Sequence, residues 1–206
     1  MTFHQRSGDY VHKQDDLPPE DRKMQFSLDG KTWKKIAQSF VVASAIRGDP
    51  GQQSSWLFVH GGLTSKWLRK FEPMIDSVRS RSSSRIESLN EFATHSFTSA
   101  AGLSFVFEKD DSPVWSRMYE KSTESRLCQE YLPGILSAFK VDRIMVGHMP
   151  QHSGKPQLRC GGRIVLADVK ISRWMNANEK PNPSAYLLTS DGSLQLLQLG
   201  QGISDT

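Results

Sequence analysis

Apolar residues along the chain fall into short continuous blocks and longer stretches of helical spacing. The first block, Trp56–Val59, is aromatic and β-branched and runs directly into His60 and two glycines. Such a run is typical of a strand, and burial on both faces fits an α/β sheet. A second block, Ile144–Val146, runs in the same way into Gly147 and His148. The pattern therefore predicts two strands that each end in a histidine flanked by glycine.

Helical spacing dominates the region between these two strands. Apolar residues recur on one side of a predicted helix that Thr64 or Ser65 would cap; they are Trp67, Phe71, Met74, Ile75 and Val78. After a serine–arginine break at 80–84, a second helix is expected to bury Ile86, Leu89, Ala93 and Phe97. We therefore interpret residues 64–99 as a helical hairpin. Residues 123–131 are also expected to be helical, and Pro133 suits the first turn of a further helix.

The remaining apolar runs predict one more helix and further strands. The helix is expected at residues 31–39, and the strands at 40–46, 162–169, 185–189 and 194–199. Asp191-Gly192, between the last two strands, is a strong hairpin signal. The order is strand–helix–strand in the first part and mostly strands at the end. The predicted fold class is therefore α/β, or α+β.

The composition limits the number of domains and the class of partner, but it does not identify a function. The chain has 206 residues, which is enough for one domain with a sizeable core. Its net charge is +4, from 26 basic and 22 acidic residues, and the basic residues are scattered rather than striped. This does not favour a nucleic-acid partner. A mild basic excess fits either an anionic substrate or an ordinary solvated surface.

The expected location is intracellular, in the cytoplasm. No apolar run approaches the roughly 20 residues of a membrane span, so no membrane partner is expected. The first 16 residues contain no apolar stretch of the kind found in secretory signals. Cys128 and Cys160 lie far apart in the sequence, without metal-type spacing, and favour a reducing compartment.

His60 and His148 are the candidate chemical groups. Imidazole is the commonest metal ligand and suits zinc, iron and manganese. Each histidine is expected at the carboxyl end of a strand, where open α/β sheets place their ligands. The same pattern also fits structural histidines. Two ligands do not complete a metal site, and a catalytic dinuclear site needs carboxylates as well.

Several motifs carry a resemblance to a known family. WLFVHGGL at 56–63 resembles the second-half motif of the phosphoprotein-phosphatase group of metallophosphoesterases. VGHMPQ at 146–151 resembles the GHTPQ motif of the Shewanella-like protein phosphatases, which are similar to bacterial diadenosine-tetraphosphatases. PVWSR at 113–117 resembles the PLWYR loop of that branch. Gly8-Asp9-Tyr10 resembles the stretch after the GNHE motif, and LADV at 166–169 the strand after the second histidine.

The resemblance implies a β-sandwich flanked by helices, with two divalent metal ions (manganese, iron or zinc) at its mouth. By motif match, His60 and His148 would both bind one of these ions. In the family, the metals bind phosphate oxygens and activate a bridging water. Arg117 would be a catalytic residue that contacts phosphate in a fork, with a surface ion pair as the alternative. His152 is expected to be a bystander.

The sequence departs from the family in its first half. GDxHG, GDxxDRG and GNHE, which supply the other metal ligands and the general acid, do not occur. Met149 stands where the family usually has threonine, and Lys170 where it often has glycine. We therefore expect residues 1–206 to be the C-terminal part of a single calcineurin-like domain whose first half is missing, with 64–99 as a helical insertion. Such a chain supplies ligands to one metal ion only.

The resemblance implies a metal-dependent phosphoprotein phosphatase, a hydrolase of phosphoric monoesters on a protein or peptide. Serine/threonine specificity is the first expectation, and tyrosine specificity the second, because the Shewanella-like branch includes members that prefer tyrosine. An alternative is a catalytically dead module that binds a phosphorylated or acidic partner. A third is a generic α+β interaction domain in which both histidines are structural.

The missing motifs generate the first prediction. The purified 206-residue chain should not hydrolyse a phenyl phosphate, because two histidines without a bridging carboxylate cannot assemble a dinuclear centre. A colorimetric assay with and without Mn²⁺ measures this. Manganese-dependent turnover by the isolated chain would show the prediction to be wrong.

Overall fold

A computed structural model gives the fold of the chain. The structure describes residues 24, 27, 29–48, 55–77, 84–96, 106, 110–171, 182–189, 193–198 and 202–205. Two compact units are present, residues 1–39 and 40–206. In the first unit, helix α2 spans Lys31–Ser39, as its apolar spacing predicts. Gly8-Asp9-Tyr10, Phe97 and the Asp191-Gly192 turn lie outside the described residues.

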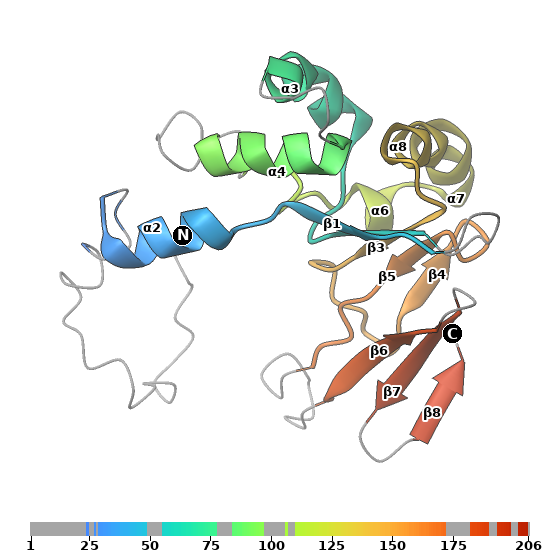
Figure 1. Ribbon diagram of the computed structural model, residues 1–206. Helices are drawn as coiled ribbons and strands as arrows, with labels where there is room; N and C mark the ends of the chain where they lie inside the picture. Colours follow the sequence, from blue (N-terminus) through green and yellow to red (C-terminus); the bar gives the residue numbers. More distant parts are fainter. Residues whose placement is uncertain are drawn as a thin grey trace. The chain divides into compact units, whose positions relative to one another are not determined.

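The second unit is built on a five-stranded mixed sheet (Figure 1). Its strands, in spatial order, are β1 (Ala43–Ile46), β2 (Trp56–Val59), β3 (Arg143–Val146), β5 (Ile164–Leu166) and β4 (Gln157–Arg159). The three central strands β2, β3 and β5 are parallel. The edge strands β1 and β4 pair antiparallel with their neighbours. The two histidine-terminated strands predicted from the sequence are therefore central neighbours.

A second, three-stranded antiparallel sheet packs on one face of the first (Figure 1). It consists of β6 (Ser184–Leu188), β7 (Leu194–Gln198) and β8 (Gly202–Asp205). Trp56, Val165 and Leu194 form a buried cluster that joins the two sheets. Because side chains alternate along a strand, Trp56 faces this cluster while Leu57 points to the other side of the sheet. Both are at most 1% exposed, which confirms burial on both faces.

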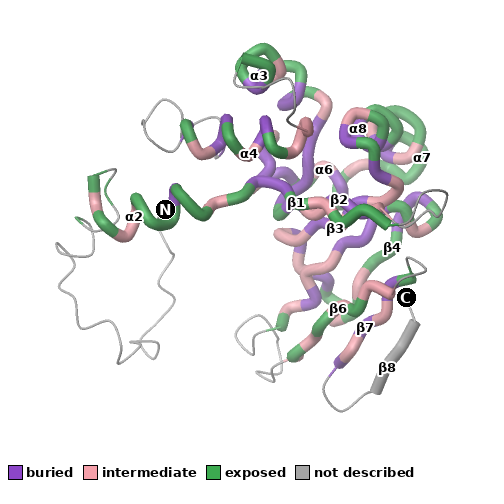
Figure 2. Tube along the Cα trace, in the orientation of Figure 1, coloured by how far each residue is buried: buried purple, intermediate pink, exposed green. Residues whose placement is uncertain are grey.

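Helices cover the opposite face of the larger sheet (Figure 1). They are α3 (Ser65–Ser77), α4 (Arg85–Ser96), α6 (Met118–Lys121), α7 (Glu124–Arg126), the π-helical segment η1 (Leu127–Tyr131) and α8 (Leu132–Phe139). Figure 2 shows the buried positions gathered between these helices and the sheet. The unit thus has a helical layer, a mixed sheet and a small antiparallel sheet, which confirms a mixed α/β class. The metallophosphoesterase form of this sandwich stays a prediction.

The two helices expected within residues 64–99 are confirmed. Trp67 and Phe71 of α3 are buried, and the Thr64 hydroxyl accepts a hydrogen bond of 3.0 Å from the Trp67 N–H. This is the N-cap that the sequence favours. Leu89 and Ala93 of α4 are also buried. The interpretation of this region as an insertion, and of the whole chain as part of one domain, stays a prediction.

Secondary structure differs from expectation in two short strands. Neither β4 nor β8 has the alternation or length that marks a strand in the sequence. The helix expected at 123–131 and the one at Pro133 form a continuous run, with the π-helical turn η1 between them. π-Helical turns are rare and often accompany functional sites, and η1 carries Cys128.

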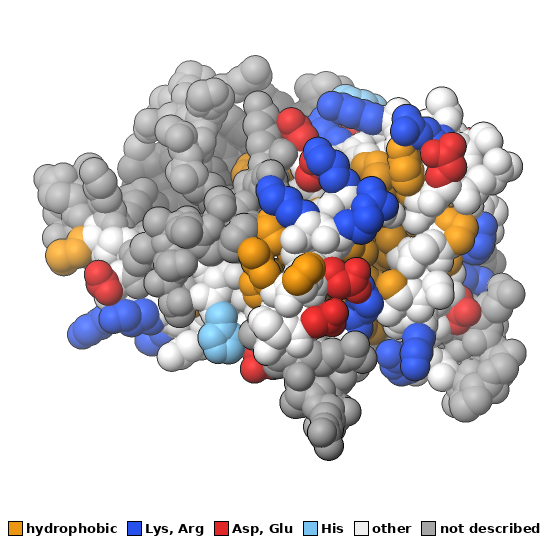
Figure 3. All heavy atoms as spheres, turned by 90° about the horizontal axis from the view of Figure 1, so that it is seen from above, with side chains coloured by type: hydrophobic (Ala, Val, Ile, Leu, Met, Phe, Trp, Pro, Cys, Tyr) orange, Lys and Arg blue, Asp and Glu red, His pale blue; other side chains and the backbone are white. Residues whose placement is uncertain are grey.

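The surface of the helical layer mixes charge types. Figure 3 looks onto this side and shows basic side chains interspersed with acidic and apolar ones. In the part of the chain that the structure describes, every helix is too short or too polar to cross a bilayer.

Asn90 on α4 connects the helical layer to the edge strand β1 through side-chain hydrogen bonds. Its Oδ1 accepts hydrogen bonds from the backbone N–H groups of Val42 and Ala43, at 2.8 and 3.1 Å. Its Nδ2 donates to the Ala43 carbonyl at 2.7 Å. One side chain therefore satisfies the hydrogen-bonding capacity of three backbone groups at the start of an edge strand.

The Asn90→Ala substitution should lower the free energy of unfolding by about 1–3 kcal/mol, because it leaves partly buried backbone groups unpaired. Urea denaturation followed by circular dichroism measures the change. Glu91→Ala, at an exposed position on the same helix, is the matched control and should change the free energy by less than about 0.5 kcal/mol. Equal effects of the two substitutions would contradict the role given to Asn90.

Candidate active site

His60 and His148 lie side by side at the carboxyl edge of the parallel strands. Val59 pairs with Val146 in the β2–β3 register, so the residues that follow these two strands leave the sheet at the same edge. The Gly147 N–H donates a hydrogen bond of 2.8 Å to the His60 carbonyl. The two imidazole rings are 5.2 Å apart between centroids and tilted by 57°. The two histidines singled out in the sequence are thus brought together.

The backbone of His148 has a left-handed conformation, with φ of 64°. This region is uncommon for residues other than glycine, although asparagine, aspartate and histidine enter it more readily than most. The turn that follows β3 therefore depends on an energetically costly conformation at the residue that carries the ring. Such local strain is often found at functional sites.

The two glycines after His60 allow a second loop to approach. The Gly61 N–H donates to the Pro113 carbonyl, and a Cβ at Gly61 would lie 2.9 Å from backbone atoms of both Val114 and Ser116. A Cβ at Gly62, where φ is 89°, would collide with the ring of Tyr119. Glycine is therefore required at both positions by close packing of the segment at 113–119.

This segment places Trp115 and Arg117 beside the histidines. The Trp115 ring meets the His148 ring edge-on, with 5.3 Å between centroids and an angle of 85°. Trp115 remains 38% exposed, so part of its surface is open to a ligand. Arg117 is exposed and makes a long ion pair of 3.8 Å with Glu120. The interpretations of Arg117 as a phosphate contact and as a surface ion pair are both compatible with this geometry.

The surroundings of His148 favour its neutral form. Burial lowers the pKa of His148, and the nearby His60 and Arg117 lower it further, while Asp168 and Glu120 act in the opposite direction. The ring is therefore mostly uncharged at neutral pH, with a nitrogen lone pair that can bind a cation. Among the described residues, neither imidazole has a hydrogen-bond partner that would occupy that lone pair.

Asp168 adds an acidic group at the same edge of the sheet. It follows β5, the third parallel strand, and its carbonyl accepts a hydrogen bond of 2.7 Å from the Gln151 N–H. Its Oδ1 accepts another, of 3.2 Å, from the Lys170 N–H. Asp168 also contributes to raising the pKa of Tyr186 to about 12, although burial is the larger cause. Asp168 has no role assigned to it in the sequence analysis. Its position just after a third apolar strand is the signal that could have placed it near the histidines.

The fit of this site to a metal is partial. His60 and His148 provide two imidazoles from adjacent strands, which is half of a typical coordination sphere. Among the described residues, just one group of three metal-capable side chains converges, and it lies elsewhere: Glu124, Cys128 and Cys160. The two histidines are therefore suited to bind one side of a divalent ion, with further ligands required from elsewhere.

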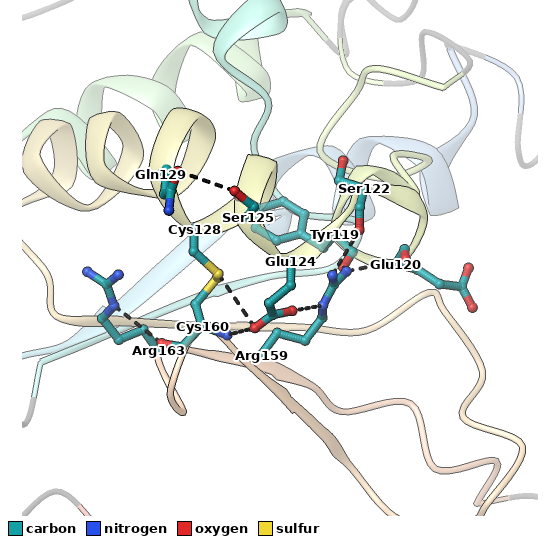
Figure 4. The surroundings of a disulfide bond; sticks show 10 residues. All are labelled: Tyr119, Glu120, Ser122, Glu124, Ser125, Cys128, Gln129, Arg159, Cys160 and Arg163. Atoms are coloured by element: carbon teal, nitrogen blue, oxygen red, sulfur yellow. Dashed lines mark hydrogen bonds and ion pairs between the residues drawn. A yellow bond between two sulfur atoms is a disulfide. The ribbon is translucent and has the colours of Figure 1, made fainter.

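The two cysteines, which in the sequence favour a reducing compartment, lie together in the structure. Cys128 and Cys160 form a disulfide, with their Cα atoms 5.3 Å apart (Figure 4). The fold overcomes their sequence separation of 32 residues by placing η1 against the end of β4. Disulfides are typical of oxidising compartments, so the cysteines no longer favour a reducing one. The cytoplasmic location stays a prediction.

Arg159, at the end of β4, links this disulfide to the candidate site. Its side chain is 9% exposed and forms a 2.8 Å ion pair with Glu124. The same guanidinium donates to the carbonyls of Tyr119 and Ser122, at 2.6 and 2.8 Å (Figure 4). These carbonyls belong to α6 and its end, directly after Arg117. Tyr119 in turn donates its hydroxyl to the Leu63 carbonyl at 2.7 Å.

Comparisons with known proteins give a fold but no family. No protein-family model matches the sequence, and no curated protein matches it. A cold-active protein tyrosine phosphatase solved at 1.1 Å matches 73% of the chain with a TM-score of 0.51 and 19% identity. A cold-active protein tyrosine phosphatase of a psychrophilic Shewanella species matches with the same TM-score and 18% identity. The chain covers 39% and 40% of these two proteins. The likeness shows that a large part of this fold is shared with these two proteins.

The charges around His148 generate a prediction. By NMR titration in the absence of metal, the His148 pKa should lie below 6.5, because burial and the charges of His60 and Arg117 disfavour the imidazolium. Arg117→Ala should raise this pKa, and Asp168→Asn should lower it. Arg126→Ala, which removes a charge paired with Glu130 on the helical layer, is the control and should leave it unchanged.

The lowered pKa of His148 also determines how the stability of the fold changes with pH. The unfolded chain binds the proton more readily than the folded one, so this group stabilises the fold above pH 6.5. That contribution is lost as the pH falls from 6.5 through the lower pKa of the folded state. A His148 pKa above 6.5, or the same shift from Arg117→Ala and Asp168→Asn, would contradict the electrostatic description.

Proposed function

We propose that this chain carries part of the active site of a metal-dependent phosphoprotein phosphatase. The observation that carries the proposal is the convergence of His60 and His148 at one edge of three parallel strands, in a fold shared with phosphatases. The motifs WLFVHGGL and VGHMPQ, which resemble those of the phosphoprotein-phosphatase group, place their histidines at this edge. The fold likeness supports a phosphatase, and the motif resemblance supports its dependence on a metal.

In this proposal the protein groups have distinct roles. His60 and His148 are ligands of one divalent ion, which in such enzymes polarises phosphate oxygens and lowers the pKa of a bound water. Arg117 binds the phosphate oxygens, and its long ion pair with Glu120 leaves the guanidinium free to reorient. Trp115 holds the His148 ring from one side and forms a wall beside the bound phosphate.

The proposed substrate is a phosphorylated protein or peptide. The matched structures are protein tyrosine phosphatases by name, and this favours phosphotyrosine, whereas the motif resemblance also covers phosphoserine and phosphothreonine. The proposed cofactors are two divalent ions, manganese, iron or zinc. His60 and His148 bind one of them.

The decisive experiment assays the product of the complete gene against phosphotyrosine and phosphoserine peptides with and without Mn²⁺. Turnover should require the metal. His60→Ala and His148→Ala should each reduce kcat/KM by about 100-fold or more, because each removes a ligand. His152→Ala, in an exposed loop next to the site, is the matched control and should stay within about threefold of the wild type.

Two results would overturn the proposal. Turnover that survives metal chelation, or that survives both histidine substitutions, would exclude the metal site described here. Binding of phosphopeptides without any turnover would instead support the alternative of a phosphatase-like binding module.

A further inference from the structure

A second cluster of metal-capable side chains surrounds the disulfide. The sulfurs of Cys128 and Cys160 and a carboxylate oxygen of Glu124 all lie within 4.8 Å of one another (Figure 4). The three residues come from the helical run α7–η1 and from the end of β4. Cys160 is 8% exposed, whereas the Glu124 side chain is 57% exposed. The cluster is therefore open to solvent on the glutamate side.

The Glu124 carboxylate is held in a defined orientation. Its Oε2 accepts a hydrogen bond of 2.8 Å from Arg159 Nε. Its Oε1 accepts the Cys160 N–H and lies 3.5 Å from Cys128 Sγ. These contacts favour the charged form and lower the pKa of Glu124. One oxygen is thus anchored by an almost buried arginine, while the other faces both sulfurs, which is how outer partners orient a metal-binding carboxylate.

In the oxidised protein the Glu124 carboxylate binds Arg159 and the Cys160 N–H. If the disulfide is reduced, two sulfur ligands and a carboxylate meet in one place, and a divalent cation relieves their mutual repulsion when the thiols ionise. Thiolates select soft or borderline cations such as Zn²⁺. A tetrahedral zinc with Zn–S bonds of about 2.3 Å requires sulfurs roughly 3.8 Å apart, so the two cysteine side chains, whose Cα atoms lie 5.3 Å apart, must rotate after reduction.

We propose that Glu124, Cys128 and Cys160 form a redox-gated site for a thiophilic divalent cation such as Zn²⁺. A dithiol reductant supplies two electrons and two protons, and the disulfide becomes two thiols while the reductant becomes its own disulfide. Zn²⁺ then binds both sulfurs and Glu124 Oε1 and displaces two protons. Water occupies the fourth position. In the oxidised protein the same sulfurs bond to each other, and the site is closed.

The site would preserve one structural link in two redox environments. In the oxidised protein the disulfide joins η1 to the end of β4, and in the reduced protein the metal joins the same two points. Arg159 serves both states, because it binds Glu124 and the carbonyls of Tyr119 and Ser122 through its own side chain. This proposal does not depend on the phosphatase function.

The test titrates the whole 206-residue chain with Co²⁺, used as a spectroscopic probe, and then with Zn²⁺. The chain carries His60→Ala and His148→Ala in all samples, so that the histidine pair cannot contribute. Protein reduced with a phosphine, which is then removed without oxygen, should show a thiolate-to-cobalt charge-transfer band that saturates at one ion per chain. Zn²⁺ should abolish this band, and oxidised protein should not show it.

Variants separate the three ligands. Cys128→Ser and Cys160→Ser should each eliminate the band, and Glu124→Gln should weaken binding by about 10-fold or more. Glu130→Gln, at an exposed position on the same helical run, is the matched control and should bind as tightly as the unmodified site. Thermal unfolding provides a second readout, since Zn²⁺ should raise the Tm of the reduced protein and not that of the oxidised protein.

Several outcomes would overturn the proposal. Absence of the band in reduced protein would exclude the site, and equal binding by oxidised protein would exclude redox gating. Equal affinities of Glu124→Gln and Glu130→Gln would exclude the carboxylate as a ligand. Loss of the fold on reduction that Zn²⁺ does not restore would also count against the proposal.

Discussion

The parallel, in-register pairing of β2 with β3 is the constraint on which the rest of the structure depends. Because Val59 is opposite Val146, His60 is level with Gly147, and His148 follows one residue later on the neighbouring strand. A shift of one residue would turn each side chain to the other face of the sheet. The hydrogen bond from Gly147 to the His60 carbonyl extends this pairing past the last strand residue. The histidine geometry is therefore a property of backbone pairing.

The loops around the two histidines are positioned by packing against the turn that follows β2. The glycine after His60 admits the segment at 113–117, which brings Trp115 against His148. Tyr119 then closes over Gly62 and binds the Leu63 carbonyl. Arg159 holds the same helix from the other side and connects it to the disulfide. The short helix α6 thus packs against the glycine turn after His60 and is also bound by Arg159, which holds Glu124.

Local pattern in the sequence was sufficient for the central strands and for most helices. Trp56–Val59 is a continuous apolar run, and Trp67 and Phe71 recur at helical spacing, so their burial follows directly from these patterns. The short strand β4 has almost no such signal, so the position of Arg159 and Cys160 could not be foreseen. The disulfide depends on that strand, because it forms between η1 and the residue after β4. Similarly, PVWSR is recognisable as a motif, but the contact of Trp115 with His148 arises from loop packing that no local pattern encodes.

The left-handed backbone of His148 also limits how this position can change during evolution or design. A side chain placed there must tolerate a positive φ, and besides glycine this favours asparagine and aspartate over most residues. These two are also oxygen-donor ligands for harder cations. In the metal site proposed above, a change of metal preference would therefore proceed through His148→Asp or His148→Asn without rebuilding the turn, whereas cysteine would have to adopt a less favourable conformation. In that proposal, the backbone biases replacement of this ligand toward an oxygen donor.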